Sequence, residues 1–352
     1  MKRNRRIRKI YEIIFVILVI IAIILFYFAF NKKTLKKIGY NKEEISVINK
    51  LSKDEINTIK KYDYNKNLIA VINNEEYDKS KLDSYLKYLD KYDKPDAIIR
   101  YVNNYKDKVE LDDFTINLLN EKYFIDEYFD RYIAYYKDHT DLDTKEIVTR
   151  INSNLDHTFY VDSKPADISK GMYTLVNKYN HLDANYVPSD LVQVDRRFTH
   201  NTTKVVKVAN DNYVKLAEAG LDAGVHFLAT TCYRDYNFQS ILYYNYVSQD
   251  GVEAADTYSA RPGSSEHQLG YSLDLTNTSY VDFDNFVYTE EYKWLKDNAH
   301  KYGFILRYPE GKEYITGYIF EPWHIRYVGV DIATYIYENN ITYEEYYAYF
   351  LR

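Results

Sequence analysis

Two histidines and two acidic residues near the C-terminal end of the chain have the types and spacing of a hydrolytic metal site. His267 and Asp274 lie seven positions apart, and Glu321 precedes His324 by three. Two imidazoles and one carboxylate form a ligand set that zinc accepts in enzymes, with the fourth tetrahedral position left for water. Glu321 can take the proton of that water. We therefore predict a zinc hydrolase in which His267, Asp274 and His324 bind the metal and Glu321 is the base.

Strand periodicity accounts for the direction of Asp274 but not for that of Glu321. Asp274 alternates with two leucines in its expected strand, so the acid and the leucines face opposite sides. In an extended segment His324 and Trp323 also face opposite sides, and Glu321 then shares the side of Trp323. Glu321 reaches the metal site only if Pro322 bends the chain. The sequence leaves both arrangements open.

These residues lie in motifs that resemble those of the VanY-type D-alanyl-D-alanine carboxypeptidases, a family of zinc D,D- and L,D-carboxypeptidases of peptidoglycan. The resemblance covers about residues 170–350. It rests on two motifs, Ser265-x-His267-x-x-Gly270-x-x-x-Asp274 and Glu321-x-Trp323-His324. The resemblance implies that His267, Asp274 and His324 are the zinc ligands and that Glu321 is the base, which agrees with the prediction from residue types.

A third segment, residues 232–239, resembles the Tyr-Arg-Ser…Gln element of that family, with Asp235 where a serine is common. The resemblance implies that Arg234 contacts the substrate. A guanidinium suits this role because it can bind a terminal carboxylate with two hydrogen bonds or steady an oxyanion. Gln239, Ser265 and Trp323 are the other expected substrate contacts.

The composition narrows the class of partner. The net charge of −6 argues against a nucleic-acid partner, which normally requires a basic face. The single cysteine, Cys232, rules out an intrachain disulfide and is expected to be a small buried residue. The 42 tyrosines are scattered and are expected on helix surfaces.

The N-terminus is expected to cross the lipid bilayer. Six basic residues lie within the first nine, and the 18 residues from 13 to 30 carry no charge, which meets the lower length limit of a transmembrane helix. A cleavable signal peptide is the alternative, but its apolar region is usually shorter and is followed by small residues. The larger basic cluster lies before the span, which predicts a single-pass protein of the cell membrane with its catalytic domain extracytoplasmic, on the cell-wall side.

The chain divides into three expected regions: a basic N-terminus and signal anchor (1–33), a helical Tyr/Lys-rich spacer or accessory domain (34–165) and a catalytic domain (166–352). The catalytic domain is predicted to be α+β, a small, mainly antiparallel sheet flanked by helices. Its expected elements are helices at 213–223, 236–247 and 290–302, two helices within 331–350, and strands at 227–233, 270–275 and 323–328. His267 is expected in a loop before its strand, and Gly303 is expected to end a helix.

The function that the sequence favours is a membrane-anchored zinc carboxypeptidase that removes the C-terminal D-alanine from peptidoglycan stem peptides. An L,D-carboxypeptidase acting on tetrapeptide stems is an alternative within the same chemistry. A non-catalytic module that binds cell-wall peptides is an alternative of another class.

Overall fold

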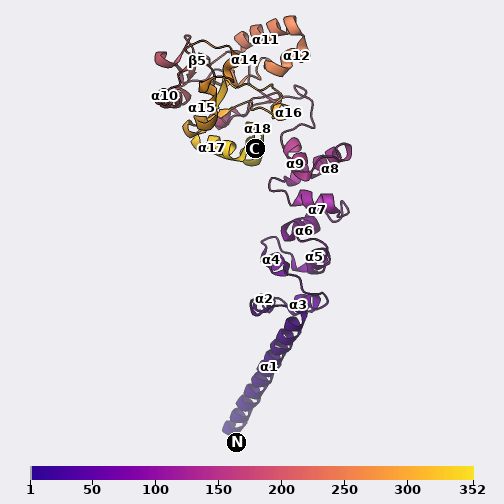
Figure 1. The fold of residues 1–352 in the computed structure, drawn as a ribbon. Helices are drawn as coiled ribbons and strands as arrows, with labels where there is room; N and C mark the ends of the chain where they lie inside the picture. Colours follow the sequence, from indigo (N-terminus) through magenta and orange to yellow (C-terminus); the bar gives the residue numbers. More distant parts are fainter. Residues whose placement is uncertain (1) are drawn as a thin grey trace. The chain divides into compact units, whose positions relative to one another are not determined.

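The computed structural model of the chain describes residues 2–352, with the side chains of the first helix from Arg8 onward (Figure 1). The chain forms two compact units, one ending at Phe124 and the other running from Ile125 to Arg352. The expected boundary between residues 165 and 166 falls within the second unit. It stays a prediction, because a compact unit and a catalytic domain need not share their limits.

The first unit is helical. Its helices are α1 (Lys2–Ile38), α2 (Lys42–Ile48), α3 (Lys53–Ile59), α4 (Leu68–Asn73), α5 (Leu82–Leu89), α6 (Pro95–Arg100) and α7 (Asp113–Leu119). Asn41 and Ser52 begin α2 and α3 as capping boxes, in which side chain and backbone satisfy each other at the helix end. Leu35, near the end of α1, is buried in one cluster with Ile45 and Ile48 of α2, so α1 ends against the helices that follow it.

Most of α1 is apolar and exposed. The span Arg8–Ile38 has 31 residues, and its most apolar window has a mean hydropathy of 3.4 with none of it buried. At 1.5 Å per residue, 18 helical residues cover about 27 Å, close to the thickness of the hydrocarbon core of a bilayer. The length and composition of α1 therefore suit a membrane crossing.

The second unit combines helices with short strands. Its helices are α8 (Phe129–Asp138), α9 (Thr144–Asn152), α10 (Lys207–Asp222), α11 (Tyr236–Asp250), α12 (Val252–Tyr258), α13 (Glu266–Leu269), α14 (Phe283–Phe286), α15 (Glu290–Asn298), α16 (Glu313–Thr316), α17 (Val330–Asn339) and α18 (Tyr343–Phe350). Its strands are β1 (Lys164–Pro165), β2 (Asn180–His181), β3 (Leu191–Gln193), β4 (Lys204–Val206), β5 (Phe227–Thr231), β6 (Ser272–Asn277), β7 (Phe304–Leu306) and β8 (His324–Tyr327).

The main sheet has the strand order β5-β6-β8-β7, and every neighbouring pair is antiparallel. Two smaller sheets pair β1 with β2 and β3 with β4. The mixture of helices with a small antiparallel sheet confirms the predicted α+β class. In the register of β6 and β8, Asp274 lies directly opposite His324, and Leu273 lies opposite Ile325.

The two faces of the main sheet have different surroundings. Leu273, Leu275 and Ile325 belong to the main hydrophobic core together with Tyr213 of α10 and Leu295 of α15. Because side chains alternate along a strand, the residues between these core positions project from the opposite face. That face carries the polar residues of the candidate site.

Most expected elements of this unit are present, with shifted ends. The first expected helix begins at Lys207 rather than at residue 213. Gly303 ends the short helical turn η6 (Ala299–Tyr302), which continues α15, with a left-handed φ of 82°, as predicted. The prediction of a loop at His267 is wrong, because His267 lies in α13. A helix of four residues is too short to show helical periodicity in its sequence, so the sequence could not have predicted it.

Candidate metal centre

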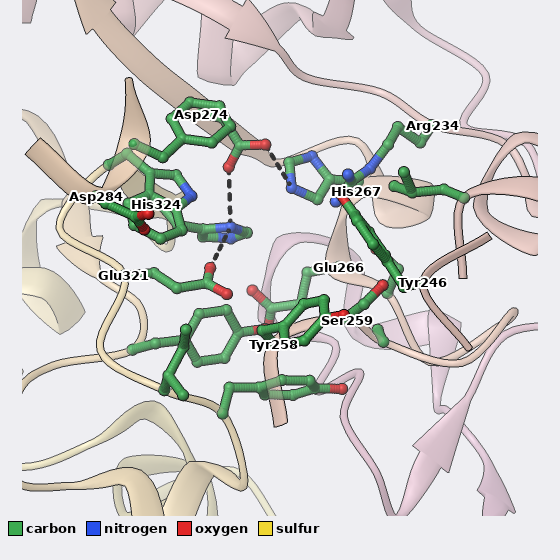
Figure 2. A pocket seen from close by; sticks show the side chains of 18 of the residues that line it. Arg234, Tyr246, Tyr258, Ser259, Glu266, His267, Asp274, Asp284, Glu321 and His324 are labelled. Carbon is green, nitrogen blue, oxygen red and sulfur yellow. Dashed lines mark ion pairs between the residues drawn. The ribbon is translucent and has the colours of Figure 1, made fainter. Parts of the chain in front are cut away.

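His267, Asp274 and His324 converge at one point on the polar face of the sheet (Figure 2). Nε2 of His267 lies 3.3 Å from Oδ2 of Asp274, and Nδ1 of His324 lies 3.1 Å from Oδ1 of the same carboxylate. One ligand-type atom from each residue lies within 4.8 Å of the others, and all three residues are buried. The structure therefore brings the three predicted ligands together.

The direction of His267 is set by a backbone acceptor. Its Nδ1 lies 2.5 Å from the carbonyl oxygen of Cys232, so Nδ1 donates the hydrogen and Nε2 keeps its lone pair. Nε2 makes no hydrogen bond with any residue that the structure describes, and it faces Asp274. A buried ring nitrogen with a free lone pair is what a metal ligand requires.

Helix α13 and the glycine after it determine where His267 and β6 meet. Gly270 ends the helix in the left-handed conformation, with φ 83°, which costs a residue without Cβ little. A Cβ at this position would lie 2.9 Å from a methyl group of Val206 and 3.0 Å from Pro188. The glycine therefore allows the chain to reverse tightly between His267 and the strand that carries Asp274.

Glu321 joins the group because the chain turns before β8. The backbone N–H of His324 donates to the carbonyl of Glu321 at 3.3 Å, and the strand begins only at His324. Strand alternation therefore does not apply between these two residues. Oε2 of Glu321 lies 3.4 Å from Nδ1 of His324, so the bend that the sequence left open is present.

Burial and charge give the site residues different protonation states. Burial, together with the nearby charge of Arg234, lowers the pKa of His267 to about 4. Burial raises the pKa of Asp274, but the two imidazoles beside it outweigh burial and hold that pKa well below its usual range. Burial and the adjacent Asp274 carboxylate raise the pKa of Glu321 well above its usual range. The site thus combines a neutral imidazole, an ionised carboxylate and a carboxyl group with a high proton affinity.

These groups fit a zinc ion. Nε2 of His267 and Oδ1 of Asp274 are buried and make no hydrogen bond within the described chain, which is costly unless another partner satisfies them. Two nitrogen donors and one carboxylate match the donor set of catalytic zinc sites, in which one position stays open. A divalent cation at this point would satisfy both orphaned atoms together.

A cavity of about 510 Å³ opens onto these residues. Arg234, Ser265 and Trp323 line it, in keeping with their predicted place at the site. Trp323 stacks on Phe283, with ring centroids 5.0 Å apart, and the pair forms part of the wall. Figure 2 shows Arg234 and Asp284 on opposite sides of the metal-binding group.

Gln239 has a different position from the other predicted substrate contacts. It is buried on α11 and is not among the residues that line the cavity. Its Nε2 donates to the carbonyl of Ala260 at 2.7 Å, and Ala260 and Ser259 do line the cavity. In this conformation Gln239 supports the cavity wall, and direct contact with a substrate stays a prediction.

Several cavity residues were not found by sequence reasoning. Tyr308 lines the cavity and lies against the ring of His324, with centroids 5.0 Å apart, and its carbonyl accepts the N–H of Glu321. Tyr246 and Tyr258 form another part of the wall. These tyrosines had no distinguishing signal among the 42 in the chain.

The remaining histidines lie outside the metal-binding group. His139 stacks on Tyr135, and His300 stacks on Tyr337. Cys232 is buried, as expected for a structural cysteine, and burial raises the pKa of its thiol well above the usual value.

The chain is similar to known carboxypeptidases. A family model described as "VanY: D-alanyl-D-alanine carboxypeptidase" matches residues 202–330. The chain is 40% identical to the putative carboxypeptidase YodJ of Bacillus subtilis, over 51% of this chain and 67% of that protein. It is 32% identical to a D-alanyl-D-alanine carboxypeptidase of Enterococcus faecalis, over 54% of this chain and 71% of that protein.

Among solved structures, the chain is similar to a vancomycin-resistance D,D-pentapeptidase VanY mutant that was crystallised with Zn(II). The sequence identity is 32%, the match covers 50% of this chain and 98% of that one, and the TM-score is 0.44.

Proposed function

Because the chain belongs to the VanY family of D-alanyl-D-alanine carboxypeptidases, we propose that it is a membrane-anchored zinc carboxypeptidase that removes the C-terminal D-alanine from peptidoglycan stem peptides. The observation that carries the proposal is the convergence of His267, Asp274 and His324, with Glu321 beside them, at the base of a cavity. His267, Asp274 and His324 are the proposed zinc ligands.

Glu321 is the proposed general base. When bound, zinc supplies the Lewis acidity that makes a water molecule nucleophilic near neutral pH. Glu321 lies beside His324 and lines the cavity, so it can accept the proton of that water. The same carboxyl group can then hand the proton to the departing amine, because an acid near the reacting atoms can act in both directions.

Arg234 is the proposed partner of the negative charge on the substrate. Its Nε is buried at the cavity wall and makes no hydrogen bond with the described residues. A carboxypeptidase must bind a free terminal carboxylate, which a guanidinium can hold through charge-assisted hydrogen bonds. Ser265 and Trp323 are the proposed neighbours of the same end of the substrate, and Gln239 is proposed to reach it by a side-chain rotation.

The apolar helix α1 is the proposed membrane anchor. Its exposed apolar side chains require a non-aqueous surrounding, which a bilayer supplies. The basic residues before the span favour an N-terminus in the cytoplasm and a catalytic unit on the cell-wall side. The peptidoglycan substrate would then be within reach of the anchored enzyme.

The experiment that tests the function is mass spectrometry of defined stem peptides after incubation with the zinc-loaded protein. We expect release of D-alanine from a pentapeptide that ends in D-Ala-D-Ala, and little release from the tetrapeptide. The reverse preference would assign the L,D-activity instead. Zinc binding without release from either peptide would support the non-catalytic binding module.

The Glu321→Gln variant tests the base. Loss of a general base commonly costs 10²- to 10⁴-fold in rate, so we expect at least about a hundredfold fall in kcat with zinc retained. Glu290→Gln, at an exposed position at the start of α15, is the matched control. Activity in Glu321→Gln equal to that of the control would refute the assigned base.

A further inference from the structure

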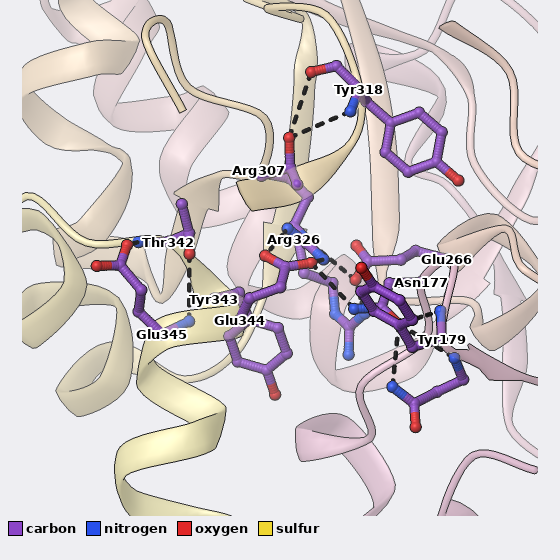
Figure 3. A network of polar contacts seen from close by, with 12 residues as sticks. Asn177, Tyr179, Glu266, Arg307, Tyr318, Arg326, Thr342, Tyr343, Glu344 and Glu345 are labelled. Atoms are coloured by element: carbon purple, nitrogen blue, oxygen red, sulfur yellow. Dashed lines mark hydrogen bonds and ion pairs between the residues drawn. The ribbon is translucent and has the colours of Figure 1, made fainter. Parts of the chain in front are cut away.

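Four charged side chains form a buried cluster (Figure 3), and one of them, Glu266, also lines the cavity of the candidate metal centre. Arg307 donates from Nε to Oε1 of Glu266 at 2.8 Å, and from both terminal nitrogens to the two carboxylate oxygens of Glu344, at 2.8 and 2.6 Å. Arg326 pairs with the same Glu266 oxygen at 3.1 Å. All four residues are at most 3% exposed. We call this group the buried tetrad.

The tetrad is electrically balanced, with two arginines and two glutamates. Taking a charge out of water is costly, and only a complete set of partners offsets that cost. Removal of one carboxylate would leave an uncompensated positive charge in a region of low dielectric, where charges interact strongly over several ångströms. A divalent cation bound nearby would feel that charge as repulsion.

Two members of the tetrad lie close to proposed metal ligands along the chain, and a third contacts one of them through its backbone. Glu266 immediately precedes His267 in α13. Arg326 follows His324 by two residues on the same strand, β8. The backbone N–H of Arg307 donates to the carbonyl of His324 at 3.2 Å. The tetrad therefore contacts the backbone segments that carry two of the three proposed ligands.

Glu344 is the member that comes from elsewhere. It lies on α18, the C-terminal helix, and reaches the tetrad only through its side chain. Its two-pronged contact with Arg307 fixes the plane of the guanidinium, because that geometry satisfies two donors and two acceptors together. Asn177 donates to Oε1 of the same carboxylate at 3.3 Å, which adds a further contact that holds Glu344.

We propose that Glu344 is a positioning residue of the metal centre, which through Arg307 fixes Glu266 and the short helix that carries His267. This inference rests on the proposed zinc carboxypeptidase function. Glu344 does not line the cavity, so it acts through its neighbours rather than on the substrate. The C-terminal helix α18 would then help to position a metal ligand in addition to packing against the core.

The neighbouring Glu345 supplies a matched control. Glu345 is also buried, but it caps α18 by accepting the N–H of Thr342, and it lies near Lys312 rather than at the tetrad. Substitution of either glutamate by glutamine should lower the stability of the fold. Only the Glu344 substitution should alter the metal centre.

The test compares Glu344→Gln with Glu345→Gln in the full-length protein. Zinc affinity is measured by competition with a chromogenic chelator. The values of kcat and KM are measured on a D-Ala-D-Ala pentapeptide, and stability is measured by thermal unfolding without zinc. Loss of a residue that orients a metal ligand typically costs 10- to 100-fold in metal affinity or activity. We expect a zinc affinity at least about tenfold weaker in Glu344→Gln, with a lower kcat and a KM within about twofold of the original. Glu345→Gln should keep the original zinc affinity despite a lower melting temperature.

Equal zinc affinity and kcat in the two glutamine variants would overturn the role of Glu344. Arg307→Lys covers the case in which Glu344→Gln does not fold, because it keeps the charge and removes only the bridge between Glu266 and Glu344. The role of Glu344 would also be overturned if Arg307→Lys bound zinc with an affinity within about twofold of that of the unsubstituted protein. Failure of the unsubstituted protein to bind zinc or to release alanine would contradict the proposed function itself, which is a different result.

Discussion

Asp274 and His324 are direct partners across the antiparallel strands β6 and β8, and this pairing brings Oδ1 of Asp274 within 3.1 Å of Nδ1 of His324. The two motifs of the sequence therefore meet through the backbone ladder of a sheet rather than through a flexible loop. Rigid strands hold side chains more precisely than loops do, which suits a metal site that must keep its geometry. The same register points Leu273 and Ile325 into the core, so the packing of the core and the geometry of the site depend on each other.

Zinc should stabilise the folded protein through His324. At a free zinc concentration of 100 times Kd, binding contributes about 2.7 kcal/mol, which corresponds to a rise in Tm of about 5–10 °C for a unit of this size. His324→Ala should lose that rise, because it removes one of three ligands. The measurement is thermal unfolding with and without zinc. His157→Ala, at an exposed histidine, is the control and should keep the rise. An undiminished rise in His324→Ala would argue against this ligand set.

Arg234 should govern recognition of the terminal carboxylate. A hydrogen bond to a charged group contributes about 1.5–3 kcal/mol, so Arg234→Ala should raise KM for a peptide acid by about 10- to 100-fold. Steady-state kinetics on a D-alanine-terminated peptide measure this effect, with Arg197→Ala as the control at an exposed ion pair. A peptide with a C-terminal amide should be a poor substrate for the original protein. Unchanged KM and kcat in Arg234→Ala would contradict the assignment.

Lys178 should make stability depend on pH in the alkaline range. Its Nζ donates to the carbonyls of Asp256 and Gly317 and lies among the rings of Phe159 and Tyr318, and burial lowers its pKa from 10.5 to about 8. Between pH 8 and 10.5 the unfolded chain holds this proton while the folded protein has released it. The unfolded chain therefore binds more protons in this window, and the contribution of Lys178 to stability becomes more favourable as pH rises, by up to about 3 kcal/mol.

Denaturant unfolding of Lys178→Met and the original protein at several pH values isolates this contribution, because other titrating groups cancel in the difference. The stability of the original protein relative to the variant should increase from pH 8 to 10.5. A difference that stays constant or decreases over that range would show that the lysine keeps its proton in the fold.

Gly270→Ala should destabilise the fold more than a glycine substitution at an open position. Both Gly270 and Gly224 have left-handed φ values, of 83° and 86°, and alanine in that conformation costs about 1 kcal/mol. A Cβ at Gly224 meets nothing within 4 Å, whereas at Gly270 it meets Val206 and Pro188 at 2.9 and 3.0 Å. We expect a loss of about 1 kcal/mol in Gly224→Ala and of about 2–3 kcal/mol in Gly270→Ala by denaturant unfolding. Equal losses of unfolding free energy in the two variants would mean that Val206 and Pro188 move aside at no cost.

The residues of the candidate site could be predicted from the sequence because a metal site depends on residue types and short spacings. His267, Asp274 and His324 have the residue types of a zinc donor set, and the structure places these three side chains together. Alternation with leucines correctly placed Asp274 on the face away from the core. The left-handed conformation of Gly303 could be predicted because a helix often ends at a residue with positive φ, which glycine adopts easily. The length of the apolar run predicted the exposed apolar helix α1.

Other features depended on contacts between residues far apart in the chain. The register of β6 with β8 decides that Asp274 faces His324, and the turn before β8 decides that Glu321 joins them. The buried pairing of Glu344 with Arg307 likewise arises only when α18 brings Glu344 to the end of β7, and the inward position of Gln239 depends on its contact with Ala260. Local patterns carry no information on such contacts, because the free energy that selects them comes from burying the whole core at once. The sequence thus determined which groups could perform the chemistry, and the packing of the chain decided which of them meet.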